Sequence, residues 1–300
     1  MIALVTGSAG FVGRHTVRAL RDRGWDVHGI DLALSADCTV ASVSDVRHFF
    51  RLDDRRFDLV VHCAAVVGGR AMIDGSPLQL AAEDLSIDAE MWRWALRTRP
   101  GRVVYFSSAA AYPTWLQTDD AIAALLEDDI DLGAGHHLGR PDQTYGWVKL
   151  TGELLAVHAR EQGLAVTVLR PFSGYGGDQA LDYPFPSILA RAVAREDPLD
   201  VWSDTVRDFV HVDDVVACTL AAVEAGVDGP LNICTGVATS FSQLAHLAAS
   251  VVGYEPEVRV LEGYPTGVRY RVGDPTKMLG VFPPVVTIAD GVNTAVKGLS

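Results

Sequence analysis

Positive charge is scarce in this sequence of 300 residues. Lys and Arg number 25 against 38 Asp and Glu, which gives a formal net charge of −13. Nucleic acids and anionic membranes repel such a field unless a basic patch offsets it, and the sequence shows no such patch. Long apolar runs are also missing, since none approaches the roughly 20 residues that a membrane helix needs. We therefore expect neither a nucleic acid nor a membrane as partner.

Cysteine is rare as well, with four residues in the chain. They are scattered, at Cys38, Cys63, Cys218 and Cys234. Without a CxxC motif or a paired spacing, they favour reduced thiols in a cytoplasmic protein over a disulfide framework. The histidine pair at 136–137 has no cysteine beside it, so no metal site is expected. Met1 leads directly into the apolar residues 2–5, and we expect no signal peptide.

The first half of the chain alternates short apolar segments with helical patterns. Strands are expected at Ala3–Thr6, Asp26–Ile30, Leu59–His62, Arg102–Ser107 and Val166–Leu169. Helices are expected at Gly13–Arg23, Leu78–Thr98 and Tyr145–Gln162. This alternation, with β-branched residues in the strands, predicts an α/β protein with a doubly wound parallel sheet of the Rossmann type.

A glycine-rich loop joins the first expected strand to the first helix. Glycines permit a tight turn there, and a helix N-terminus attracts the pyrophosphate of a dinucleotide. The spacing is GxxGxxG, and the third glycine lets the helix pack closely on the sheet. The predicted cofactor-binding residues of this loop are Gly7, Gly10, Phe11, Val12 and Gly13.

Asp31 ends the second expected strand, about twenty residues after the glycines, where an acid binds the hydroxyls of an adenosine ribose. A carboxylate at this place repels the 2′-phosphate of NADP, and no Arg or Lys follows at 32–34. The predicted cofactor is therefore NAD.

We expect residues 1–169 to form the dinucleotide-binding domain, with part of 208–236 returning to it. Residues 170–300, which are less regular, are expected to form mainly a smaller substrate-binding lobe.

Tyr145 and Lys149 stand four residues apart, on one face of an expected helix. A tyrosine with a pKa of about 10 is a poor base at neutral pH. A neighbouring ammonium, together with an oxidised nicotinamide ring, stabilises the tyrosinate and makes it a usable base. Ser107 and Ser108 follow the strand upstream, where a hydroxyl can share the substrate proton with Tyr145.

Glycine loop, serine, tyrosine and lysine in this order resemble the extended short-chain dehydrogenase/reductase superfamily, which contains nucleotide-sugar epimerases, dehydratases and reductases. The resemblance covers nearly the whole chain. Its further matches are His62-Cys63-Ala64-Ala65, Arg170-Pro171-Phe172 with Gly174-Tyr175-Gly176, Arg207-Asp208-Phe209-Val210-His211-Val212-Asp213-Asp214 and Leu231-Asn232-Ile233-Cys234-Thr235-Gly236.

The resemblance implies roles for individual residues. The catalytic serine of the family stands four residues before Tyr112 and so falls on Ser108 rather than Ser107; Tyr145 and Lys149 complete the catalytic set. Tyr145 and Lys149 are also implied cofactor contacts, as are Ala64 and Ala65. Arg207 matches the arginine that contacts the nucleotide diphosphate. The implied substrate contacts are Val67, Gly68, Ser108, Tyr145, Ser173 and Arg207.

Two parts of the chain are similar to GDP-fucose synthase and GDP-mannose 3,5-epimerase, namely residues 64–69 and the pair Tyr112-Pro113. This similarity leaves a GDP-linked sugar open as the substrate. Those enzymes use a cysteine where this chain has Ala110, and the histidine of GDP-fucose synthase falls on Tyr183. Epimerisation at carbons 3 and 5 is therefore disfavoured. Dehydratases carry Asp-Glu where this chain has Ala109-Ala110, so dehydration is disfavoured too.

Chemistry at one carbon remains. The function expected from the resemblance is an NAD-dependent nucleotide-sugar epimerase that acts at carbon 4 through a transient ketone. An NAD(P)H-dependent 4-ketoreductase would use the same residues in one direction. A non-catalytic NAD sensor or scaffold is the alternative of another class, and loss of the tyrosine or the lysine would mark it.

The chain departs from the family pattern at several places. The adenine-contacting acid appears as Ser at 42 and 44, with Asp45 slightly too late; Asp84 replaces a helix asparagine; and Ser173 stands where an asparagine is expected. Family members often pair through the helices near 78–98 and 145–162. We therefore expect a homodimer, with Trp92 or Trp94 at the partner surface. The segment Thr114–Arg140 is expected to be an acidic surface excursion with one short helix.

Overall fold

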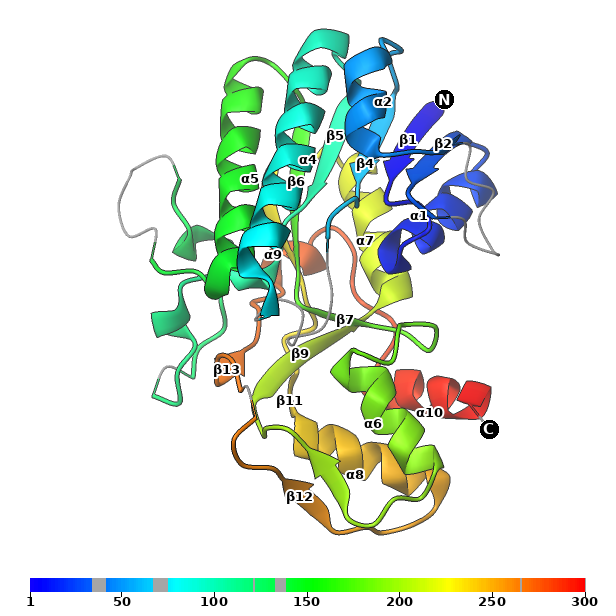
Figure 1. Cartoon of the computed structure of the whole chain (residues 1–300), viewed down its shortest axis with the longest axis vertical. Coiled ribbons are helices and arrows are strands. Elements are labelled where there is room, and N and C mark those ends of the chain that lie inside the picture. The colour runs from blue at the N-terminus through cyan, green and yellow to red at the C-terminus, as the bar shows by residue number, and fades with distance from the viewer. Residues whose placement is uncertain (34–41, 67–74, 121, 133–138, 265, 300) are drawn as a thin grey trace.

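Seven parallel strands form the main sheet of this computed structural model, which describes residues 1–33, 42–66, 75–120, 122–132, 139–264 and 266–299. The order across the sheet is β10-β6-β5-β4-β1-β2-β3 (Figure 1). The strands are β1 (Ile2–Thr6), β2 (Asp26–Asp31), β3 (Ser42–Val43), β4 (Leu59–His62), β5 (Arg102–Phe106), β6 (Val166–Pro171) and β10 (Gly229–Ile233). Strand order reverses between β1 and β4, and in such sheets ligands bind outside the carboxyl ends of the strands at that point.

Helices cover both faces of the sheet because successive strand residues point to opposite sides. Ala3 and Val5 pack on one face with α1 (Phe11–Asp22) and α7 (Val212–Glu224). Leu4 lies in the core of the other face, which is covered by α2 (Val46–Leu52), α4 (Pro77–Thr98) and α5 (Gln143–Glu161). The predicted doubly wound α/β class is confirmed.

A second group of elements has its own core below the main sheet in Figure 1. A small sheet joins β7 (Ser173–Tyr175), β9 (Val206–His211), β11 (Ala238–Ser240) and β13 (Tyr270–Arg271). Around it lie α6 (Pro184–Val193), α8 (Phe241–Val252), α10 (Ile288–Leu299) and the paired strands β8 (Leu199–Val201) and β12 (Val258–Val260). The chain returns from β9 through α7 to β10 of the main sheet, so the segment 208–236 contributes to both sheets. The predicted boundary at residue 169 falls inside β6, and the division into two domains stays a prediction.

The acidic segment after residue 114 is not simply a surface excursion. Two short 3₁₀ turns, η2 (Thr114–Leu116) and η3 (Glu127–Asp129), occur in its described part. Leu125, Glu127 and Ile130 are buried, and the Glu127 carboxylate accepts a hydrogen bond from the backbone N–H of Asn232 in β10 at 2.9 Å. The prediction was wrong here because these inward-facing residues alternate with the solvated acids and give no periodic signal.

Trp92 and Trp94 do not lie at a surface. Their exposed fractions are 4% and 0%, and both belong to the core between α4 and the sheet. The Nε1–H of Trp94 donates to the carbonyl of Asp53 at 2.9 Å. The expectation that either tryptophan reaches a partner is therefore wrong, because both pack toward the sheet.

Candidate active site

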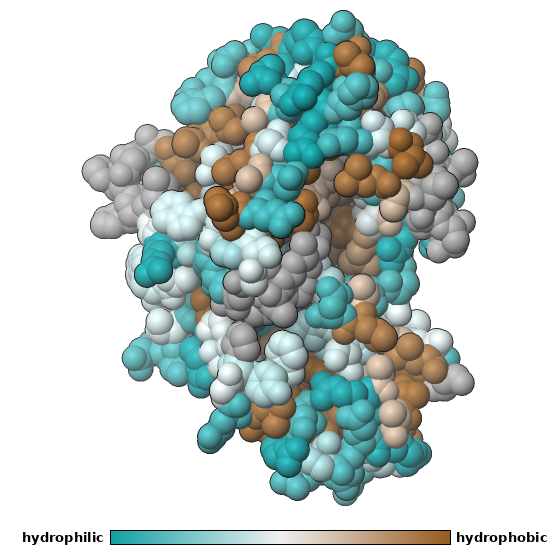
Figure 2. Space-filling model, viewed as in Figure 1, coloured by the Kyte–Doolittle hydropathy of each residue, from teal (hydrophilic) through white to brown (hydrophobic). Residues whose placement is uncertain are grey.

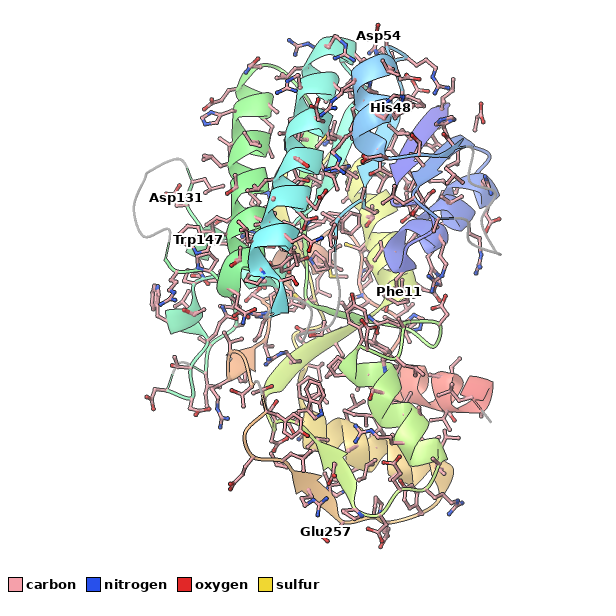
Figure 3. All side chains as sticks on the ribbon, viewed as in Figure 1. Phe11, His48, Asp54, Asp131, Trp147 and Glu257 are labelled. Carbon is pink, nitrogen blue, oxygen red and sulfur yellow. The ribbon has the colours of Figure 1, made fainter. Side chains whose placement is uncertain are left out.

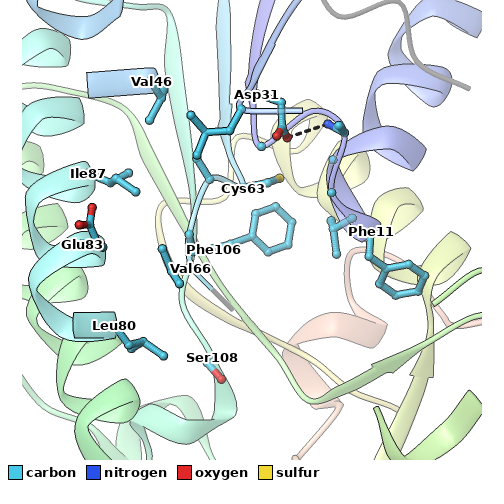
Figure 4. A pocket seen from close by; sticks show the side chains of 18 of the residues that line it. Phe11, Asp31, Val46, Cys63, Val66, Leu80, Glu83, Ile87, Phe106 and Ser108 are labelled. Carbon is cyan, nitrogen blue, oxygen red and sulfur yellow. Dashed lines mark hydrogen bonds between the residues drawn. The ribbon is translucent and has the colours of Figure 1, made fainter. Parts of the chain in front are cut away.

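A cavity of about 840 Å³ opens at the carboxyl ends of the main strands, where the two groups of elements meet. Figure 2 shows this face hollowed between its upper and lower parts. Figure 4 places Phe11 on one side of the cavity and Leu80, Glu83 and Ile87 of α4 on the other. Phe11 itself lies at the level where the upper elements meet the lower ones (Figure 3).

The glycine loop forms one wall of this cavity, and all five of its predicted residues line it. Gly7 has φ +65°, and a Cβ there would lie 2.8 Å from the backbone N of Ala64. A Cβ on Gly13 would collide with the carbonyl oxygen of Gly7. Because side chains are excluded at both positions, the backbone at the N-terminus of α1 stays open to a ligand, as a dinucleotide pyrophosphate requires.

Asp31 lies at the end of β2 with its carboxylate held at the rim of the cavity. Its Oδ2 accepts the N–H of Ala9 at 2.9 Å, which Figure 4 marks, and its Oδ1 accepts the N–H of Ala33 at 3.1 Å. The carboxylate is thus fixed toward the glycine loop, where a ribose adjoining the pyrophosphate would lie.

Asp45 and Val46 also line the cavity, so Asp45 reaches this wall although it stands later in the chain than the family pattern. The backbone N–H of Ser44 bonds to the carbonyl of Asp31 at 2.9 Å, which brings the start of α2 beside the end of β2. Asp45 holds Arg47 through contacts of 2.6–3.1 Å, and Glu83 holds it from the other side at 2.5 Å. The hydrogen bond from Arg47 lowers the pKa of Asp45. Arg47 is therefore a neutralised cation and not a free phosphate binder.

Ser108, Tyr145 and Lys149 line the opposite part of the same cavity. Ser108 follows β5 and caps the 3₁₀ turn η1 (Ala109–Ala111), where its Oγ accepts the N–H of Ala110 at 3.1 Å. Tyr145 lies in the first turn of α5, and the Nζ of Lys149 is 5.7 Å from the centroid of its ring. Gly146 allows α5 to approach η1, since a Cβ there would collide with the carbonyl of Ala110.

The ammonium of Lys149 is buried, with 4% of the residue exposed. Burial lowers the pKa of Lys149, but the charges of Tyr145, Asp88 and Asp84 outweigh burial and raise the pKa above its ordinary value. Lys149 therefore remains a cation beside the Tyr145 ring. A positive charge at this distance stabilises a tyrosinate, as the predicted role of Tyr145 requires.

A buried hydrogen-bond network lies behind Lys149. The Thr6 hydroxyl accepts the N–H of Ala64 at 3.2 Å, and its oxygen lies 2.8 Å from Nδ1 of His62. The Nε2–H of His62 then donates to Asp88 at 3.2 Å. Tyr105 donates to the other oxygen of Asp88 at 2.6 Å. The sequence offered only His62 at the end of its strand as a sign of this network.

Other predicted residues do not line the cavity. Ser173 and Arg207 are absent from its walls. Arg207 lies on β9, where its guanidinium is 5.8 Å from the ring of Phe241 and donates to the carbonyl of Val206. Val67 and Gly68 lie outside the described residues. Ala64 and Ala65, for which cofactor contact is predicted, do line the cavity.

Tyr183 joins the cavity wall from the turn that caps α6. Burial, followed by the charge of Tyr145, raises the pKa of Tyr183 to about 12, so its hydroxyl keeps its proton. Gln179 lines the cavity from the same connection. Both residues come from the irregular half of the chain, where no local pattern indicates which side chains turn inward.

Known proteins resemble this chain over nearly its whole length. The profile of the NAD dependent epimerase/dehydratase family matches residues 3–234. A dTDP-4-dehydro-6-deoxy-D-allose reductase of a Streptomyces species is 32% identical, covering 93% of this chain and 90% of the relative. The rice GDP-mannose 3,5-epimerase 1 is 26% identical, covering 96% and 79%. Among solved structures, the UDP-glucose 4-epimerase of Thermotoga maritima with UDP-glucose is 27% identical, with a TM-score of 0.84 and coverage of 99% and 98%.

Among the described residues, no helix combines the length and the apolar character needed to cross a membrane.

The matches to known proteins confirm the likeness to the short-chain dehydrogenase/reductase enzymes that the sequence motifs indicated. The chain therefore belongs to the NAD-dependent epimerase/dehydratase family.

Proposed function

We propose that this protein is an NAD-dependent nucleotide-sugar epimerase that inverts carbon 4 through a transient ketone. One observation carries the proposal: Ser108, Tyr145 and Lys149 line the same cavity as the glycine loop and Asp31. A hydroxyl-bearing carbon bound between these two walls has a proton acceptor on one side and a dinucleotide site on the other.

The cofactor site supports NAD. Gly7 and Gly13 leave the space for a pyrophosphate, and the Asp31 carboxylate, held by two backbone N–H groups, suits ribose hydroxyls. Asp31 repels a 2′-phosphate, and Arg47 is already paired with Asp45 and Glu83. When bound, NAD supplies the acceptor for a hydride, and an enzyme that returns the hydride to the same carbon has no need of a separate reductant.

The chain supplies the proton chemistry. Lys149 stabilises the phenolate form of Tyr145, which takes the proton of the sugar hydroxyl and becomes the neutral phenol, and the Ser108 hydroxyl holds the sugar oxygen. The residues Ala109 and Ala110 beside Ser108 carry no acid or base, so the chain has no group there for proton removal at a second carbon. The chemistry is thus confined to one centre.

For the substrate we propose a nucleoside-diphosphate sugar held mainly by the lobe after residue 170. Arg207 contacts the diphosphate in this proposal, and Val67, Gly68 and Ser173 contact the sugar. Arg207 lies on β9, which pairs with β7, and β7 begins directly after Phe172 on the cavity wall. This position of β9 next to the cavity supports the proposed role of Arg207. A GDP-linked sugar is the first choice, from the similarity of residues 64–69 to GDP-sugar enzymes. A cytoplasmic location is also part of the proposal, and the scattered cysteines, which have no paired spacing, support it.

A 4-ketoreductase is the second candidate. The Streptomyces relative favours this function, because that relative is named as a reductase of a 4-dehydro sugar. The two functions separate by stoichiometry. A reductase consumes one reduced cofactor for each product, whereas an epimerase converts substrate without net change in the cofactor.

Replacing Tyr145 by phenylalanine tests the proposal. With a panel of GDP-, UDP- and dTDP-hexoses, we expect Y145F to lower kcat by at least about 100-fold, because the proton acceptor is lost. NAD binding, measured by calorimetry, should stay within about twofold, since the dinucleotide walls are unchanged. Turnover by Y145F at the wild-type rate would contradict the proposed base. Normal NAD binding without turnover of any sugar by the wild type would favour the sensor or scaffold.

A further inference from the structure

Asp84 lies buried on α4 beside the catalytic cavity, with an exposed fraction of 1%. Its Oδ1 accepts the backbone N–H of Val66 at 2.5 Å, and Val66 lines the cavity. Its Oδ2 is also buried and has no hydrogen-bond partner among the described residues. A carboxylate oxygen in this condition is costly unless a nearby positive charge compensates it.

Lys149 of α5 supplies that positive charge. It acts on Asp84 and on Asp88, and both acids act on it in return. Asp84 and Asp88 stand one turn apart on α4, which packs against α5 along the outer face of the sheet (Figure 1). The ammonium, 5.7 Å from the centroid of the Tyr145 ring, is therefore also within electrostatic reach of both carboxylates.

The two carboxylates differ in their other partners. Asp88 accepts hydrogen bonds from His62 and Tyr105, and although burial opposes ionisation, these bonds and Lys149 hold its pKa below the ordinary value. Among the described residues, Asp84 has only the Val66 N–H and the charge of Lys149 against its burial, and burial raises its pKa to about 6. Asp88 is thus a permanent anion, whereas Asp84 changes its charge near neutral pH.

We propose that Asp84 is a positioning residue that acts through Lys149, its carboxylate offsetting part of the ammonium field at Tyr145 and so setting how readily Tyr145 loses its proton. The inference rests on the proposed role of Tyr145 as the base. A neutral asparagine, the residue that the family pattern leads one to expect here, makes the Val66 hydrogen bond but carries no charge. The exchange therefore alters the field at Tyr145 and leaves the anchor in place.

The remaining charged or titratable groups around the Tyr145–Lys149 pair are not altered by this exchange. They come from β4, β5, α4, α5 and the turn before α6, and are His62, Cys63, Tyr105, Asp88, Glu83, Glu153 and Tyr183. Glu83 offers a matched control. It is the residue before Asp84 on the same helix, but its carboxylate pairs with Arg47 at 2.5 Å, which offsets its charge.

The test is an ultraviolet titration of tyrosinate in the NAD-saturated protein from about pH 5 to about pH 11, a range that includes the ordinary titration of tyrosine near pH 10. The wild-type curve minus the Y145F curve isolates Tyr145. The same subtraction is made in the D84N and E83Q backgrounds, with D84N/Y145F and E83Q/Y145F as blanks. No sugar substrate is needed.

We expect D84N to move the Tyr145 step to lower pH by roughly one unit, as the loss of one nearby unit charge implies. E83Q should leave the step unchanged. D84A, which also loses the Val66 anchor, should show the same shift as D84N if charge is what matters. A Tyr145 step that D84N does not move overturns the inference and leaves the proposed base intact. Absence of any Tyr145 step contradicts the base, and the inference with it.

Discussion

At the residue scale, the cofactor site depends on a single carboxylate. Asp31 is held by the N–H groups of Ala9 and Ala33, so its charge faces the ribose position without freedom to turn away. We expect Asp31→Asn to weaken NAD binding by about tenfold, because a charged hydrogen bond is worth roughly 1.5–3 kcal/mol. Discrimination against NADP should shrink as well. Calorimetric titration with both dinucleotides measures this, and Asp26→Asn on the exposed start of β2 is the control. Equal affinity of wild type and D31N for NAD would refute the assignment.

Asp84 also gives the stability of the protein a pH dependence. An acid whose pKa is raised by folding from 3.8 to about 6 keeps its proton longer in the native state. The unfolding free energy therefore contains a contribution that is present below about pH 4 and lost by about pH 6, worth on the order of 3 kcal/mol. D84N lacks this contribution. The Tm of D84N minus the Tm of the wild type should therefore increase as the pH rises from about 4 to about 6. A Tm difference that does not change with pH would argue against a raised pKa of Asp84.

Residues of the site differ in how far sequence predicts them. Gly7, Gly13 and Asp31 follow from local spacing, because a strand, a turn and a helix N-terminus fix their neighbours within one βαβ unit. Tyr183 reaches the cavity through a tertiary approach of the second half of the chain, which no local period encodes. Arg207 matches a family motif, yet the walls of the cavity do not include it.

At the scale of elements, a buried ion pair joins the catalytic helix to the sheet. Arg170 of β6 contacts Glu153 of α5 at 2.6 Å, and Ser107 at the end of β5 donates to the same carboxylate. The side chains of Arg170 and Glu153 are 1% and 3% exposed. We expect Glu153→Gln to cost about 3–5 kcal/mol of unfolding free energy, because the guanidinium is left without a buried counter-charge.

Urea unfolding measures that cost. Glu161→Gln is the matched control, since Glu161 lies on the same helix and pairs with the exposed His158. Its effect should stay below about 1 kcal/mol, as is usual for surface pairs. If E153Q and E161Q unfold at the same urea concentration, the buried pair does not hold α5 in place.

The five strands that the sequence predicts match strands of the main sheet to within two residues at each end, because strand and helix periods alternate clearly there, whereas no strand was predicted at β3 or β10. Leu59–His62 matches β4 at both ends, while β6 runs on to Pro171. The burial of Glu127 could not be predicted, since a glutamate in an acidic run indicates solvent. Its burial depends on the N–H of Asn232, more than a hundred residues away.

At the scale of the whole molecule, α4 and α5 run side by side (Figure 1) and carry exposed apolar side chains. Leu85, Trp147 and Leu154 are 38%, 49% and 38% exposed there, and Trp147 lies on the outer side of α5 in Figure 3. We propose that a second copy covers this surface in a homodimer. Sedimentation should show a dimer for the wild type and a monomer for Trp147→Asp/Leu154→Asp.

The control for this prediction is Val285→Asp, an equally polar change at a residue that is 72% exposed outside α4 and α5. It should sediment as the wild type does. A wild type that sediments as a monomer at micromolar concentration would remove the proposed homodimer.

The proposed epimerisation through a ketone is tested most directly by following a deuterium label at carbon 4 of the sugar. Nucleoside-diphosphate hexoses carrying deuterium at that carbon are incubated with the protein and NAD, and products are analysed by NMR and mass spectrometry. Hydride removal and return predict a C4 epimer that keeps its deuterium, with no net NADH formed, and Y145F should produce none. Loss of the deuterium to water, or product formation only with stoichiometric consumption of a reduced dinucleotide, would contradict the proposed epimerase.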